Sequence, residues 1–133
     1  MNLRQSNIVE LAPLVSGRTS TLTGSAVDLR KYEGVGQIIL QCEAASAGTD
    51  PTMNVKIQES ATSGGSYTDV SGAAFTEVTD AADSTQMIAI DLAACKGFVK
   101  VIGTIGGTSS PAFTFGVSMV ANRKAGRNAS QAV

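Results

Sequence analysis

The sequence contains no histidine and no tryptophan, and only two tyrosines and four phenylalanines among its 133 residues. Without histidine, the chain lacks the usual general base near neutral pH and the commonest transition-metal ligand. A Ser-His-Asp triad or a Cys-His nucleophile therefore cannot be built from this chain. The few aromatic side chains also leave little material for lining a glycosidase cleft around two carboxylates. We predict that the protein is not an enzyme.

Cysteine is scarce as well, because Cys42 and Cys95 are the only two and cannot form a disulfide framework. Cys42 falls on the same strand face as Ile38 and Leu40, so it is expected to be a small core hydrophobe. We expect both thiols to be reduced and the protein to be made in a cytoplasm. Two separated cysteines are poor material for a zinc site. No metal and no cofactor are predicted.

Long apolar runs are absent too. No stretch approaches the roughly 20 apolar residues of a membrane helix. The first 15 residues carry Glu10 and Pro13 within their apolar run, unlike a signal peptide. The net charge of −1 gives no basic field that would attract nucleic acid. We therefore expect neither a membrane nor a nucleic acid as partner.

The few charges are distributed unevenly along the chain. Between Glu43 and Asp91 there are eight acidic residues and one basic residue, Lys56. The C-terminal residues 122–133 are instead basic, with charges at Arg123, Lys124 and Arg127. Such a tail is either solvated or satisfies an acidic patch on a neighbouring protein.

Short aliphatic segments alternate with turns rich in Gly, Ser and Thr, a pattern that favours strands. In the clearest segment, Met53, Val55 and Ile57 alternate with polar residues. Turns or loops are expected at residues 32–34, 44–51 and 106–111. The eight predicted strands span residues 25–29, 35–43, 53–60, 67–70, 75–78, 86–92, 98–105 and 112–121.

This spacing predicts an all-β fold, a single-domain antiparallel β-sandwich over residues 24–121. Greek-key and jelly-roll topologies both fit the strand spacing. Residues 1–23 are predicted to form an extended arm, because Pro13 is incompatible with a regular helix or a central strand. The arm is expected to dock either on its own body or on a partner. Its apolar residues are Leu3, Ile8, Val9, Leu11 and Leu14, with Val15 beside them.

Two further motifs have ordinary structural explanations. Asp80 and Asp83 share a turn and could offer oxygen ligands to calcium, but aspartate is also a common turn residue. Residues 103–108 resemble a phosphate-binding loop in composition only, because the Gly-Lys-Ser/Thr ending and a following helix are missing. We assign the first to turn chemistry and the second to a hairpin turn.

Residues 55–75, VKIQESATSGGSYTDVSGAAF, resemble a strand–turn–strand pattern of small head proteins of tailed bacteriophages. Residues 23–34, TGSAVDLRKYEG, are similar to the opening strand of that group, and FVKVIGT at 98–104 to a late strand. The resemblance implies a jelly-roll-like cement or decoration protein that binds the outside of a capsid. It also implies a dimer or trimer that bridges neighbouring major capsid subunits.

The family supplies no catalytic residues, so candidate contact residues come from the arm and the tail. They are Leu3, Ile8, Val9, Leu11, Leu14, Arg123, Lys124 and Arg127. Deleting residues 1–15 is expected to weaken attachment while the body still folds. Two alternatives remain open: a tail or neck completion protein, and a carbohydrate-binding adhesin module that would stack sugars on Tyr32 or Tyr67.

Overall fold

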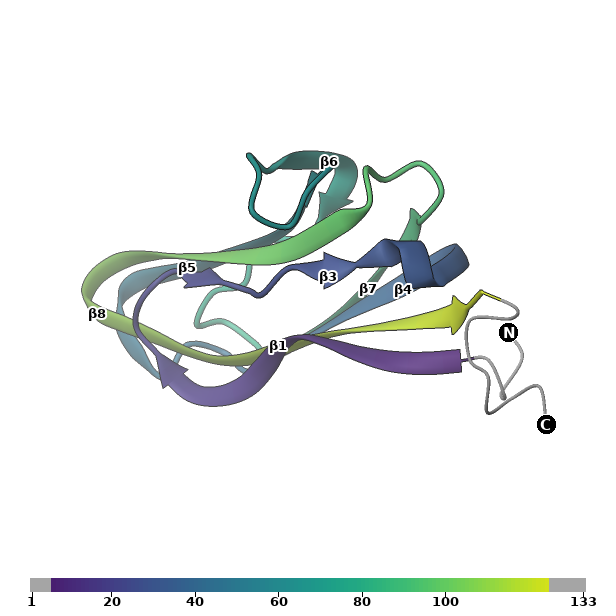
Figure 1. Cartoon of the computed structure of the whole chain (residues 1–133). Helices are drawn as coiled ribbons and strands as arrows, with labels where there is room; N and C mark the ends of the chain where they lie inside the picture. The colour runs from purple at the N-terminus through teal and green to yellow at the C-terminus, as the bar shows by residue number, and fades with distance from the viewer. Residues whose placement is uncertain (1–5, 125–133) are drawn as a thin grey trace.

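The computed structural model describes residues 6–124, and this part of the chain is almost entirely β-structure (Figure 1). One 3-10 helix, η1 (Leu29–Lys31), interrupts the strands, and no α-helix occurs among residues 6–124. The predicted all-β class is therefore confirmed. The strands in chain order are β1 (Ser6–Arg18), β2 (Leu22–Thr23), β3 (Val27–Asp28), β4 (Tyr32–Cys42), β5 (Ala47–Ser60), β6 (Thr68–Ala74), β7 (Ser84–Asp91) and β8 (Phe98–Arg123).

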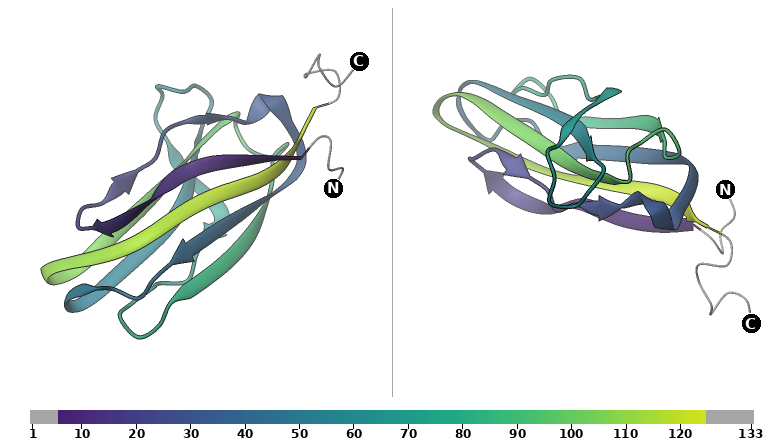
Figure 2. Two further views of the ribbon diagram at one scale, coloured as in Figure 1. Left: turned by 90° about the horizontal axis from the view of Figure 1, so that it is seen from below. Right: turned by 45° about the horizontal axis from the view of Figure 1, so that its top comes forward.

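The long strand β8 organises the sheet because it bends and pairs on both of its edges (Figure 1). Its first limb, residues 98–112, pairs antiparallel with β5 on one edge and with β2 and β3 on the other. Its second limb, residues 113–123, pairs with β1 and β4. We call β1, the second limb, β4 and β7 wing A, and β2, β3, the first limb, β5 and β6 wing B. The four strands of wing A lie side by side in the left view of Figure 2.

The sheet is nearly closed, because the segment between β6 and β7 follows the free edge of β5. The amide of Phe75 donates to the carbonyl of Val55 at 2.9 Å. Met53 and Val78 exchange backbone hydrogen bonds of 2.8 and 3.0 Å. The chain then continues into β7 at the outer edge of wing A. The two wings consequently enclose a single core.

Alternate residues of the long strands fill that core, as the sequence pattern predicts. On β4 they are Ile38, Leu40 and Cys42, and on β5 they are Met53, Val55 and Ile57. Full burial of one aliphatic or phenylalanine side chain contributes about 1.5–3 kcal/mol. The second limb of β8 provides the largest share, with Phe113, Phe115, Val117, Met119 and Ala121 all buried.

The bend in β8 corrects the prediction of a loop at 106–111. Pairing with β5 continues across this segment through Thr49–Thr108 and Ala47–Ala112, with register shifts on the way. The turning is achieved by left-handed residues on both strands. They are Gly48 and Asp50 on β5 and Gly107, Ser109 and Ser110 on β8.

Three shorter predictions also need correction. Residues 32–34 begin β4 rather than forming a turn, and Gly34 at φ +77° accompanies a register shift there. The strand predicted at 25–29 is limited to β3, because Asp28 caps η1 by accepting from the Arg30 amide. Residues 75–78 follow β6, which extends to Ala74, and do not form a strand of their own. They pair with β5 through the Phe75 amide and the bridge at Val78.

The N-terminal segment docks on its own body as an edge strand. β1 pairs with β8 from Ser6–Asn122 to Arg18–Phe113, with three register shifts after Glu10. Each shift places an extra residue on β1, so the consecutive residues Leu11 and Ala12 are both buried. Pro13 lies within this bulged stretch on an edge strand, where a missing ladder donor is tolerated.

We predict that Gly107→Ala destabilises the fold by about 1–3 kcal/mol. Gly107 has φ +110°, and an added Cβ would lie 2.8 Å from the carbonyl oxygen of Asp50 on β5. Urea denaturation followed by circular dichroism measures the change. Gly64→Ala is the matched control, because its Cβ would meet nothing within 4 Å and it should change the free energy of unfolding little. Equal stability of the two variants would contradict a strained bend.

Candidate functional site

Residues 6–124 contain no group of three or more His, Cys, Asp or Glu side chains arranged to hold a metal ion. Burial raises the pKa of the Cys42 and Cys95 thiols to about 11 each, so both are protonated at neutral pH and poor nucleophiles. Asp83 accepts a 2.8 Å hydrogen bond from the Ala44 amide, which ties its turn to the chain just after β4.

The outward-facing residues of wing A form a surface with several exposed apolar side chains, which we call the outer face. The strand register places Ile8, Val120, Gln37 and Ala89 in one cross-strand row. The next row contains Glu10, Ser118, Ile39 and Met87 in the same strand order. Val35 and Gln41 extend these rows along β4. The left view of Figure 2 shows the four strands that carry this face.

Several apolar side chains of the outer face are highly exposed, whereas those of Ile39 and Val120 are partly buried. The exposed fractions are 79% for Ile8, 69% for Leu14, 63% for Met87 and 51% for Val35. Scattered exposed apolar residues are common on proteins, but a contiguous group on one face marks a binding surface. Here the strand register brings Ile8, Val35 and Met87 onto one side of one wing.

Leu14 makes the outer face uneven. The β1 bulge carries the Leu14 backbone over Gly116, where an added Cβ would lie only 3.2 Å from Leu14 Cα. Leu14 consequently lines two neighbouring depressions of about 170 and 260 Å³. Glu10 and Ile8 line the smaller depression, and Glu43 and Asp83 line the larger.

The outward side of wing B has different chemistry. The Lys56 ammonium lies 3.0 Å from the Asp69 carboxylate, which also accepts from Gln58. The Lys100 ammonium lies 4.2 Å from the centre of the Tyr67 ring. These polar groups satisfy one another, so wing B presents a hydrated polar surface rather than an apolar one.

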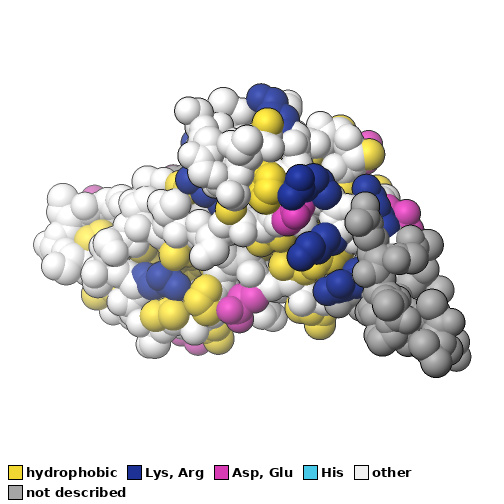
Figure 3. All heavy atoms as spheres, viewed as in Figure 1, with side chains coloured by type: hydrophobic (Ala, Val, Ile, Leu, Met, Phe, Trp, Pro, Cys, Tyr) yellow, Lys and Arg dark blue, Asp and Glu magenta, His cyan; other side chains and the backbone are white. Residues whose placement is uncertain are grey.

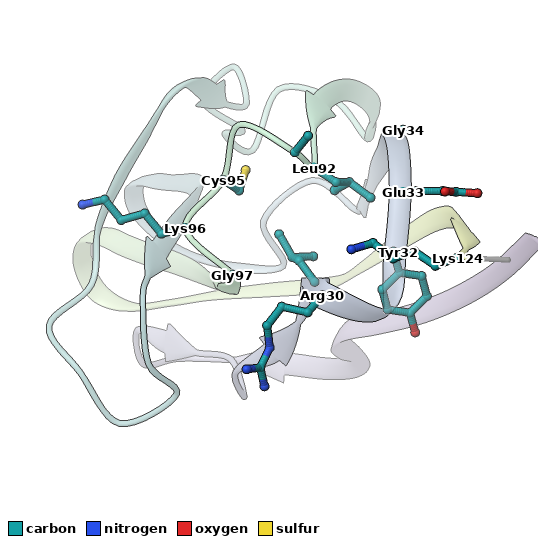
Figure 4. A pocket seen from close by; sticks show the side chains of 11 residues that line it. Arg30, Tyr32, Glu33, Gly34, Leu92, Cys95, Lys96, Gly97 and Lys124 are labelled. Carbon is teal, nitrogen blue, oxygen red and sulfur yellow. The ribbon is translucent and has the colours of Figure 1, made fainter. Parts of the chain in front are cut away.

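A second candidate surface is a basic end beside η1. Arg30, Lys96 and Lys124 line a depression of about 290 Å³ together with Tyr32 and Glu33 (Figure 4). In the close-up, Arg30 and Lys96 point away from each other. Figure 3 shows separate Lys and Arg side chains on this region of the molecule. The basic groups therefore do not converge on one anion.

The structure places the predicted contact residues in different environments. Ile8 and Leu14 lie on the outer face, whereas Val9 is partly buried against the core. Leu11 is only 3% exposed and packs in the core, away from the outer face. Leu3 and Arg127 lie outside the described residues.

The two basic candidates are partly buried near η1. The Arg123 guanidinium lies 6.0 Å from the centre of the Tyr32 ring, and the Lys124 amide donates to the carbonyl of Lys31 at 3.0 Å. These contacts fix the end of β8 against the start of β4. Residues 123 and 124, at the start of the predicted basic tail, thus pack against the body.

Sequence reasoning missed the contribution of the central strands to the outer face. Val35, Ile39, Met87 and Val120 were not among the predicted contact residues. A signal was present, because β4 carries apolar residues on both faces between Val35 and Leu40. An antiparallel strand that is apolar on both faces is covered on both sides or exposes one apolar face.

The scan of protein-family models found no match to this chain, and the search of curated proteins found none either. Within residues 6–124, no helix has the length and apolar character needed to cross a membrane. The geometry of the outer face and the sequence resemblance therefore carry the functional argument.

We predict that the Asp28–Arg30 pair makes the stability of the basic end depend on pH. The hydrogen bonds from Arg30, at 2.9 Å, lower the pKa of Asp28 to about 2. Because the folded-state pKa is depressed, this contribution is present above about pH 4 and is lost as the pH falls through 2. Asp28→Asn should cost about 0.5–1 kcal/mol at pH 7, since the pair is partly exposed.

Urea denaturation of both proteins at pH 7 and pH 2 measures this difference. The two free energies of unfolding should converge at the lower pH. If the difference in free energy of unfolding between the two proteins is unchanged at pH 2, the destabilisation comes from altered capping of η1 and not from the lost charge.

Proposed function

We propose that this protein is a structural virion protein that binds the outside of a tailed-bacteriophage capsid and bridges major capsid subunits. The observation that carries the proposal is the exposed apolar outer face of wing A on a body with a continuous core. The resemblance of residues 23–122 to phage head proteins supports the assignment to a capsid. In this proposal the protein is made in the host cytoplasm and has no catalytic role.

Such a protein must stay attached to the capsid while the capsid is under outward pressure. Packaged DNA presses capsid subunits apart, and a bridging protein resists by adding contact area across their junctions. Each contact is weak, but a shell repeats it many times, so the stabilisation is summed by multivalency. A nearly closed sheet with backbone pairing along both edges of β8 suits this task, because it transmits force without opening.

A jelly-roll-like sandwich and a dimeric or trimeric state are part of the proposal. The two wings face each other across one core, which is compatible with a sandwich. The outer face and the basic end lie on different parts of the surface, so one subunit has two regions for contacting neighbours.

The two alternative functions, a carbohydrate-binding module and a tail or neck completion protein, require different surface features. A carbohydrate-binding module would need free aromatic rings, but a cationic side chain lies over the rings of both Tyr32 and Tyr67. The Tyr67 hydroxyl also donates to the carbonyl of Ser63 at 2.8 Å. A tail or neck completion protein would use a similar adhesive face, and it differs from a cement protein in copy number.

The experiment is cosedimentation of the purified chain with DNA-free capsids of the phage that encodes it. We expect saturable binding at a stoichiometry of hundreds of copies per shell, in line with a repeated lattice contact. Ile8→Ser, at the most exposed apolar position, should weaken binding several-fold without loss of stability. Saturation at about a dozen copies would favour the neck or tail role, and absence of binding would reject the proposal.

Deleting residues 1–15 is less informative than the sequence suggests. The deletion would remove most of β1, including the buried Leu11 and Ala12, and would uncover an edge of β8. Loss of attachment in that variant would therefore mix a folding defect with a lost contact. Single substitutions at exposed positions avoid this problem.

A further inference from the structure

The outer face of wing A carries acidic side chains at both of its edges, beside the exposed apolar residues Ile8 and Met87, and we call these acidic groups the acidic border. Glu10 lies at the β1 edge and Asp91 at the opposite, β7 edge. Glu43 and Asp83 line the depression beside Leu14. Lys and Arg are absent from positions 8, 10 and 14 of β1, 35, 37, 39 and 41 of β4, 85, 87, 89 and 91 of β7, and 114, 116, 118 and 120 of β8. Arg18, near the end of β1, is partly buried, and its guanidinium donates to the carbonyl of Pro13 at 3.3 Å.

Exposed apolar side chains with charged side chains beside them are typical of protein interfaces. Charge complementarity determines which partner fits the acidic border, because like charges placed opposite each other are unfavourable. A partner for this face needs an apolar patch bordered by lysine or arginine.

A second copy of the chain does not meet this requirement. Pairing two outer faces would gather the acidic groups of both copies around one interface, with no basic residue from the described outward positions to balance them.

We propose that the outer face of wing A is the surface that seats the protein on the shell, and that it docks on an apolar patch bordered by basic side chains on the capsid exterior. This inference rests on the proposed function and specifies which face is used and what it recognises. Met87, Ile39, Val35 and Ile8 supply the apolar contact. Glu10 and Asp91 orient the protein on the patch by pairing with its basic border.

Two consequences distinguish this arrangement from a purely apolar contact. Attachment should weaken as salt screens the acidic border, because exposed charges interact weakly beyond a Debye length of about 8 Å at physiological salt. Each single contact should also be weak and easily exchanged, so that tight attachment arises only on an intact lattice.

The test is cosedimentation with DNA-free capsids at 50 mM and 500 mM NaCl, using two pairs of variants. Glu10→Lys reverses a border charge, and Glu77→Lys makes the same charge change beside Asn54 of β5, on wing B. Met87→Ser removes apolar contact from the outer face, and Ile102→Ser is its counterpart on the outward side of wing B. Thermal unfolding confirms that each variant is folded before its binding is compared.

We expect Glu10→Lys to weaken binding roughly three- to ten-fold at low salt and much less at high salt, while Glu77→Lys binds as the wild type does. Met87→Ser should weaken binding roughly ten-fold at both salt concentrations, because about 1.4 kcal/mol corresponds to a factor of ten. Ile102→Ser should leave binding unchanged.

The outcomes separate this inference from the function on which it rests. If the wild-type chain does not sediment with capsids, the proposed function fails and this inference fails with it. If the wild-type chain binds but Glu10→Lys and Met87→Ser bind equally well, the function stands and the assignment of the outer face is wrong. If sedimentation velocity shows that Met87→Ser dissociates an oligomer without affecting capsid binding, the face belongs to a second copy and the inference is overturned.

Discussion

The architecture depends on backbone hydrogen bonding along both edges of the bent strand β8. One edge is satisfied in turn by β1, β2 and β3, and the other by β4 and β5. The partner strands are divided between the two limbs of β8. The single bend of β8 therefore produces both wings and places their apolar sides against each other. The bend requires residues with left-handed backbone conformation, among them Gly48 and Gly107.

The two wings share one core but present opposite chemistry to the outside. Wing B balances its outward charges internally, as in the Lys56–Asp69 pair, whereas wing A leaves Ile8, Leu14 and Met87 uncovered. Exposed apolar area opposes solubility, so a surface of this kind is more readily explained by binding than by stability. The asymmetry therefore gives the molecule one side with exposed apolar side chains and one hydrated side.

Much of the fold was predictable from period-two patterns, because inward residues such as Ile38, Val55 and Phe115 fall on one face of their strands. The bend at Gly107 and the bulges near Pro13 were not, because pairing with distant strands overrode the local turn and breaker signals. The same bulges moved Leu11 into the core while leaving Leu14 exposed. The rest of the candidate site depends on which strands are neighbours, and this long-range information is not contained in any local segment.

The pairing of Ser6 with Asn122 brings the two ends of the described chain to the same place, beside each other on adjacent strands of wing A (Figure 1). A peptide or reporter domain fused at either end would thus emerge from nearly the same point. Short linkers could join these positions to make a circular permutant, with new ends opened in the exposed turn around Gly64 between β5 and β6. Such a permutant would carry cargo away from wing A and leave the outer face unobstructed.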